Sequence, residues 1–246
     1  MRFVLDPYLP DGQVKMIIAG DGLREYEKSL KSLGVSVLYT KKADRISGAL
    51  ATHADLVVFP FGNGRFLLDP GQEQLANTLQ EKGAEYAFGS APKDGYPLDV
   101  PYNAVKIGKT LICNPKTLDS SIFHLAKSED CAIISCKQGY TKCSVAVVSE
   151  NAVITDDPGI KKALTPFFDV LLVQKGSVCL DGYHYGLFGG CCGLISKDTL
   201  LFVGDYKKHE DAERIRSFLR NYGVYPESLC GKPLKDIGSL IPLRIE

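Results

Sequence analysis

The sequence has no excess of charge of either sign, because 29 Lys and Arg residues balance 29 Asp and Glu residues among 246. A strongly basic surface is what attracts nucleic acid and anionic lipid over long distances. No run of like charge exceeds a few residues, a pattern typical of solvated helix faces. We therefore expect neither nucleic acid nor a membrane as a partner.

Long hydrophobic runs are also missing, since no stretch approaches the 18 apolar residues of a membrane span. The first residues, MRFVLDPYLPDG, contain no apolar signal region and no cleavage site. The eight cysteines lie mostly inside apolar runs such as KTLICNP and DCAIISC, where a free cysteine packs as a small hydrophobe. A secreted disulfide framework is typical of shorter chains, so we expect a cytoplasmic protein.

No metal-binding or nucleotide-binding motif has the residue spacing that such a site requires. Cys131, Cys136 and Cys143 are separated by four and six residues, which is not zinc-finger spacing. Gly20 and Gly22 begin a dinucleotide fingerprint, but Glu25 takes the place of its third glycine. These patterns predict no metal and no cofactor.

A repeated unit organises the chain. Five times a short apolar strand is followed by a helix of about ten to fifteen residues and a second strand rich in β-formers. The first strands are expected in residues 15–22, 54–62, 109–115, 151–157 and 199–205. The helices are expected in residues 23–34, 70–83, 117–130, 158–167 and 208–223, and Gly34, Gly83 and Gly223 are placed to end three of them.

Three of the units begin with an additional strand. Tight polar turns at Gly108-Lys109, Glu150-Asn151 and Lys197-Asp198 join two short apolar strands ahead of the helix. The first two units show no clean hairpin. A doubly wound parallel sheet has no use for three such hairpins. The pattern therefore predicts a single α/β domain, residues 1–246, of repeated ββαβ units, with residues 90–103 connecting its two parts.

Five ββαβ units around a pseudo-five-fold axis describe the pentein, or guanidino-group-modifying-enzyme, fold, and this chain resembles that superfamily. The resemblance is carried by residues 137–160, 180–193, 200–205 and 234–243. In these segments the chain is similar to a bacterial branch of uncharacterised pentein-like proteins. The resemblance implies a five-bladed β/α propeller with a ligand pocket at its axis. It also implies a Cys nucleophile, a His and acidic residues acting on arginine-like compounds.

The chain departs from the superfamily pattern at the nucleophile. Catalytic penteins carry this cysteine near the C-terminus, and the corresponding stretch DIGSLIPL contains Ser239. Serine without an adjacent base is a poor nucleophile. The region where the resemblance places the catalytic histidine contains His184. Translation initiation factors of this fold bind without catalysis, so a protein without the nucleophile still fits the fold.

The catalytic candidates are three cysteines and two histidines. Cys191 and Cys192 follow a Gly-Gly turn, and Cys143 follows Lys142, whose charge would lower the pKa of the thiol. Each could equally be a small buried residue. His53 would act with Asp55 or bind a polar ligand, because on an extended backbone their side chains point to the same side. A surface hydrogen bond is the alternative for this pair.

The remaining histidines have plainer interpretations. His124 lies on the apolar face of SIFHLA and is expected in the core. His209 is expected to be a structural residue at a helix N-terminus.

Polar residues at strand ends form the ligand-binding prediction, because equivalent positions in five units meet at one axis. Such a group would suit a guanidinium, an amine or a divalent cation, and Gln138 and Tyr140 would add an amide and a phenol. The set comprises Asp55, Asn103, Asn114, Gln138, Tyr140, Asp156, Asp157, Asp205, Asp236 and Ser239.

Two functions remain open from the sequence. The first is a protein that binds a small guanidino or amino compound, either as a Cys-dependent hydrolase or amidinotransferase or without turnover. The second is a non-catalytic binding or assembly protein on the same fold, monomeric or oligomeric. A thiol beside a histidine and convergent carboxylates would favour the first.

Overall fold

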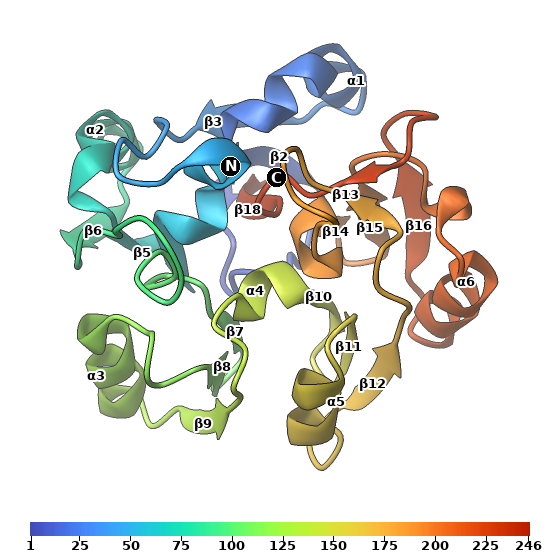
Figure 1. Ribbon diagram of the computed structural model, residues 1–246. Helices are drawn as coiled ribbons and strands as arrows, with labels where there is room; N and C mark the ends of the chain where they lie inside the picture. Colours follow the sequence, from blue (N-terminus) through green and yellow to red (C-terminus); the bar gives the residue numbers. More distant parts are fainter.

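The computed structural model describes residues 1–246 and shows five small mixed sheets, each with its own helical segment (Figure 1). In four of the sheets an antiparallel strand pair is followed along the chain by a helix and then by a strand parallel to the second one. The remaining sheet has the same pairing, but one strand of its antiparallel pair comes from the C-terminus. The helix that follows each strand pair lies at the outside, and the first strands lie toward the middle (Figure 1). This arrangement turns five segments of the chain toward one central region.

The element bounds follow the repeat. The second unit contains β4 (Val58–Gly62), β5 (Arg65–Leu68), α2 (Glu73–Glu81) and β6 (Glu85–Phe88), and the third contains β7 (Val105–Ile107), β8 (Thr110–Cys113), α3 (Ser120–Ser128) and β9 (Ala132–Ser135). The fourth contains β10 (Val145–Ser149), β11 (Ala152–Thr155), α5 (Pro158–Leu164) and β12 (Asp169–Leu172). The fifth contains β14 (Cys192–Ser196), β15 (Thr199–Phe202), α6 (Ala212–Asn221) and β16 (Tyr225–Ser228).

The first unit is completed by the C-terminus. Its own elements are β2 (Val14–Ala19), a short helical stretch ending in α1 (Glu27–Ser32), and β3 (Ser36–Tyr39). The antiparallel partner of β2 is β18 (Ile241–Ile245), which also pairs with β1 (Arg2–Phe3). Away from these sheets, β13 (Val178–Cys179) pairs with β17 (Leu234–Lys235). The first unit therefore lacks a hairpin because its first strand comes from the other end of the chain.

All three predicted hairpin turns are confirmed. The residue pairs that flank them are Ile107 with Thr110, Ser149 with Ala152, and Ser196 with Thr199. The helix-ending glycines Gly34, Gly83 and Gly223 have positive φ, as predicted.

The absence of a hairpin in the second unit is a wrong prediction. β4 and β5 form one, with Gly62 paired to Arg65. Asn63 and Gly64 between them have positive φ, which an Asn-Gly turn supplies at low cost. Pro60 inside β4 obscured the strand pattern.

The core fills the space between each helix and its sheet. In the fifth unit the apolar face of α6, which includes Ile215, Phe218 and Leu219, packs in one buried cluster with Leu200 and Phe202. Each of the five buried clusters joins two neighbouring units; this one also includes Ala146 and Ile154 of the fourth unit. No helix of the structure is long and apolar enough to cross a membrane.

Five segments immediately ahead of the first strands form the central region. They are the turn Ala54–Leu56 before β4, Asn103 before β7, α4 (Thr141–Ser144) before β10, the turn Phe188–Cys191 before β14, and residues 236–239 before β18. Figure 1 shows α4 in the middle of the molecule. The candidate site is built from these segments.

Candidate functional site

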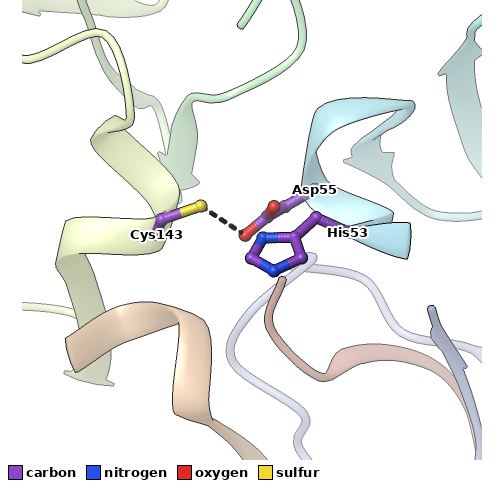
Figure 2. Close-up of side chains that lie close together, drawn as sticks. All are labelled: His53, Asp55 and Cys143. Carbon is purple, nitrogen blue, oxygen red and sulfur yellow. Dashed lines mark hydrogen bonds between the residues drawn. The ribbon is translucent and has the colours of Figure 1, made fainter. Parts of the chain in front are cut away.

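Two of these segments bring three chemically active side chains together: Asp55, Cys143 and His53, which immediately precedes the turn Ala54–Leu56 (Figure 2). The Cys143 Sγ lies 3.2 Å from the Asp55 Oδ2, and one ligand atom from each residue lies within 4.8 Å of the others. All three side chains are buried. The sequence predicted an extended backbone from His53 to Asp55, but the backbone at Asp55 is a helical turn. The side chains of His53 and Asp55 nevertheless face the same cluster.

Asn103 fixes the segment that carries Cys143. Its Oδ1 accepts hydrogen bonds from the backbone N–H groups of Lys142 at 2.6 Å and Cys143 at 3.2 Å. Its Nδ2 donates to the Asp55 carbonyl and to the Cys143 Sγ, both at 3.2 Å. Asn103 therefore links the second unit to the fourth and orients the thiol. Its predicted role in binding a ligand stays a prediction.

Ser239 and Lys142 continue the network below the thiol. The Ser239 Oγ donates to the Asp55 Oδ2 at 2.6 Å, and the Lys142 Nζ donates to the Ser239 Oγ at 2.9 Å. Lys142 also donates to the Gly189 carbonyl at 3.1 Å. Ser239 does have a basic neighbour, but its side chain is fully buried. Unlike Cys143, which is also buried, Ser239 does not line the pocket described below, so it is not placed as a nucleophile.

Asp236 forms a second buried carboxyl beside the cluster. Its two oxygens accept hydrogen bonds from the N–H groups of Leu187 at 2.9 Å and Gly238 at 3.0 Å. Its Oδ1 lies 3.8 Å from the His53 Nδ1. Gly190 is required here, because a Cβ at that position would stand 2.0 Å from the Asp236 Oδ1. The Gly-Gly turn thus makes room for a carboxyl.

Burial dominates the protonation states of the cluster. Burial, followed by the carboxyl groups of Asp55 and Asp236, raises the pKa of the Cys143 thiol well above its usual range. The expectation that Lys142 lowers this pKa is wrong, because its ammonium group is directed to Ser239. Burial lowers the pKa of His53 and raises the pKa of Asp236 to about 6. At pH 7 the imidazole is neutral, so its contact with Asp236 is not an ion pair.

A pocket of about 350 Å³ opens above Cys143. Its wall includes the predicted residues Gln138, Tyr140, His184 and Asp236. The other residues that line it are Leu50, Lys175, Leu180, Tyr183, Tyr185 and Leu187. The pocket therefore combines a thiol and a carboxyl with apolar and aromatic walls, the composition of a small-molecule site.

A smaller cavity of about 160 Å³ adjoins the first and has His53 in its wall. The two cavities share Asp236 and Leu180. His53 is thus reached from the smaller cavity and Cys143 from the larger pocket.

Several predicted ligand residues lie outside the pocket, and their position in the repeated unit explains their structural roles. Polar residues after the second strand of a unit precede its helix, and there they cap turns. Asp157 accepts from the Ile160 N–H, Asp205 from the Lys207 N–H, and Asn114 from the Lys116 N–H. Asp157 also accepts from the Gln138 Nε2 at 3.1 Å, which places it behind the pocket wall.

Asp156 is buried beside the turn that precedes β14. Its Oδ2 accepts from the Phe188 N–H at 3.2 Å, and burial raises its pKa to about 7. Its Oδ1 has no partner.

Cys191 and Cys192 are not brought to the pocket. They pack in a buried apolar cluster, and both thiols donate to the Phe188 carbonyl, at 3.1 and 3.6 Å. Burial raises the pKa of Cys191 well above its usual range. This position matches the packing alternative for the two residues.

Sequence reasoning missed several residues around the site. The sequence indicates neither the buried hydrogen bonds of Lys142 nor the place of Tyr183 and Tyr185 in the pocket wall. Both flank His184 in an irregular segment, where no periodicity reveals side-chain direction. His124 was wrongly expected in the core: it is exposed on α3.

The comparisons with known proteins fit this architecture. The family model of a family of unknown function, DUF6873, matches residues 17–241. No protein among the curated sequences matches the chain.

Three solved structures illustrate the likeness in fold. The inosamine-phosphate amidinotransferase of Streptomyces griseus has a TM-score of 0.63 at 10% identity, over 99% of this chain and 97% of that one. C. jejuni agmatine deiminase with substrate bound has a TM-score of 0.58 at 11% identity, over 99% and 96%. Dimethylarginine dimethylaminohydrolase of Pseudomonas aeruginosa, complexed with citrulline, has a TM-score of 0.54 at 10% identity, over 88% and 92%.

These three enzymes are members of the pentein superfamily, and at such low identity the likeness is one of fold. The chain belongs to the DUF6873 family, and it has the mixed α/β fold of the pentein enzymes.

Proposed function

We propose that this protein binds a small guanidino or amino compound in the pocket above Cys143 and acts on it as a Cys-dependent hydrolase or amidinotransferase. The observation that carries the proposal is a pocket whose wall contains the Cys143 thiol and the buried Asp236 carboxyl, with a second buried carboxyl, Asp55, 3.2 Å from the thiol. The thiol and the carboxyl groups together match what a guanidinium requires.

The charge balance of the cluster supports a cationic ligand. The buried cation of the cluster is Lys142, and its Nζ is engaged by Ser239 and by backbone carbonyls. Lys175 in the pocket wall lies 3.8 Å from the Asp157 Oδ2, a carboxyl outside the cluster. The Asp55 Oδ1 has no hydrogen-bond partner although it is buried. A buried acceptor without a partner costs about 1–3 kcal/mol, and a ligand N–H would satisfy it. Carboxylates bind guanidinium groups through charge-assisted pairs of hydrogen bonds.

The related folds support the same chemistry. The three neighbours are an amidinotransferase, an agmatine deiminase and a hydrolase complexed with citrulline. Agmatine contains a guanidino group and citrulline a ureido group. We infer that this chain is a single five-bladed pentein domain of a bacterial branch, and that its pocket lies on the pseudo-five-fold axis. Its eight free cysteines fit the reducing cytoplasm, where we place it.

The chemical step uses groups already in contact. A bound cation beside Cys143 lowers the pKa of the thiol, and the proton passes to Asp55 or to the neutral imidazole of His53. The sulfur then bonds to the central guanidinium carbon. The carbon–nitrogen bond breaks, and the leaving amine takes the proton. Water, or an acceptor amine, attacks the same carbon and restores the thiol. His184 at the pocket mouth is the alternative proton carrier.

Binding without turnover is the second candidate. Two observations favour it: Ser239 stands where the resemblance places the nucleophile, and burial raises the pKa of the Cys143 thiol. Both candidates require the same pocket.

Ligand-induced stabilisation tests the shared part of the proposal. The panel is arginine, agmatine, methylarginines, creatine, ureido analogues and simple amines. At 100 times its dissociation constant, a ligand adds about 2.7 kcal/mol to the free energy of unfolding. For a chain of this size that raises Tm by roughly 5–10 °C. Citrulline is the neutral control for arginine. No shift with any cation, or an equal shift with citrulline and arginine, would contradict a cation site.

A further inference from the structure

The cluster of His53, Asp55 and Cys143 has the donor set of a transition-metal site. An imidazole nitrogen, a carboxylate oxygen and a thiol sulfur lie within 4.8 Å of one another, and the Sγ and Oδ2 are 3.2 Å apart. Zinc binds these donors at about 2.0–2.3 Å, which puts tetrahedral neighbours roughly 3.5 Å apart. Small side-chain rotations would therefore bring all three onto one ion.

Two atoms of the cluster have no hydrogen-bond partner. The His53 Nδ1 and the Asp55 Oδ1 are buried and unpartnered, in side chains of residues only 2% and 1% exposed. Buried polar atoms in proteins are normally paired. An ion between these side chains would satisfy both atoms, which is an observation separate from their proximity to the thiol.

The surroundings also suit a divalent cation. The Asn103 Nδ2 donates to the Cys143 Sγ at 3.2 Å, and a donor at sulfur favours the thiolate. A thiolate and a carboxylate neutralise the two charges of the ion, and Asp236 adds a carboxyl 3.8 Å from His53. Entry is available, because Cys143 lines one cavity and His53 the adjoining one.

We propose that His53, Asp55 and Cys143 bind one divalent ion of the zinc class, Zn²⁺ or Co²⁺, with a fourth coordination position open to the pocket. The spacing of residues close together in the sequence could not predict this metal site, because Cys143 lies 88 residues after Asp55. Mixed imidazole, carboxylate and thiolate donors suit these ions. The metal and a guanidinium would use the same thiol and carboxylate, so they are alternative occupants. The metal site rests on its own geometry and not on the proposed ligand.

Cobalt titration of the full-length, chelator-treated protein is the test. We expect one Co²⁺ per chain and a thiolate-to-cobalt charge-transfer absorption, with Zn²⁺ displacing the cobalt. Cys143→Ser should abolish the absorption. His53→Gln should retain it and weaken binding by at least about 10-fold. His53→Gln also keeps the test informative if Cys143→Ser does not fold, and circular dichroism reports the fold of each variant.

Cys179→Ser is the matched control, because Cys179 is an exposed thiol outside the cluster. This variant should bind cobalt as the unmodified protein does. The proposal is overturned if no cobalt binds at one equivalent, if folded Cys143→Ser keeps the absorption, or if Cys179→Ser loses it. None of these results depends on a guanidino ligand.

Discussion

Lys142→Met should lower the free energy of unfolding by about 3 kcal/mol, the largest stability effect that we expect from a single substitution near the site. The Lys142 Nζ donates to the Ser239 Oγ, the Gly189 carbonyl and the Val145 carbonyl. Methionine keeps the buried stem and removes all three donors together with the cation that offsets Asp55. In thermal denaturation this corresponds to a fall in Tm of roughly 6–12 °C.

Two further variants identify the cause of that loss. Lys207→Met removes an exposed lysine and should change stability by less than about 0.5 kcal/mol. Adding Asp55→Asn to Lys142→Met removes the remaining charge and should recover at least about 1 kcal/mol relative to additivity. Strict additivity, or a loss below about 1 kcal/mol for Lys142→Met alone, would show that the Lys142–Ser239–Asp55 network does not stabilise the fold.

Cys143→Ala should abolish turnover of any guanidino compound that the protein processes, by more than about a thousandfold. The methyl group cannot form the bond to the guanidinium carbon, while Asp55 and Asp236 remain to hold the ligand. Binding should therefore persist, and ligand-induced stabilisation should stay within a few degrees of the unmodified protein. The measurement is release of ammonia, amine or urea, or formation of an amidinated acceptor, at saturating ligand.

Cys192→Ala is the control for the loss of a buried thiol. Cys192 packs away from the large pocket, so its removal should leave turnover largely unchanged. Equal loss in the two variants would assign the effect to packing and not to a nucleophile. Binding by the unmodified protein without turnover across the panel would favour the non-catalytic candidate.

The parts of the fold that the sequence predicts are those encoded locally. Turn residues at Gly108-Lys109, Glu150-Asn151 and Lys197-Asp198 mark three hairpins, and each turn works through residues adjacent in the chain. The pairing of β18 with β2 joins the two ends of the chain, and no local pattern encodes it. The hairpin between β4 and β5 in the second unit, in contrast, could have been predicted, because Asn63-Gly64 is a strong local turn signal.

The site residues also divide into those whose roles a local sequence signal predicts and those whose roles only the fold reveals. Asp157 is followed by a proline and a helix, a sequence signal for an N-cap, and that is its role. Asp236 precedes a strand and faces the centre instead. Both aspartates stand at strand ends. Their roles differ because a helix follows Asp157 and a strand is the next element after Asp236. The contacts of Ser239 with Asp55 and Lys142 span 184 and 97 residues, so only the fold reveals them.

The central claim is that the buried carboxyl groups of Asp236, in the pocket wall, and Asp55, beside Cys143, bind a cationic guanidino or amino group. The most direct test is a calorimetric titration of the best panel ligand into the unmodified protein and Asp236→Asn at pH 8, above the pKa of about 6 that burial gives Asp236. Asparagine preserves the size of the side chain and one of the two oxygens that accept from Leu187 and Gly238, so thermal denaturation of the variant checks that its fold is kept. Loss of the charge should weaken binding at least about 10-fold, or 1.4 kcal/mol. Equal affinity for the two proteins would contradict the claim.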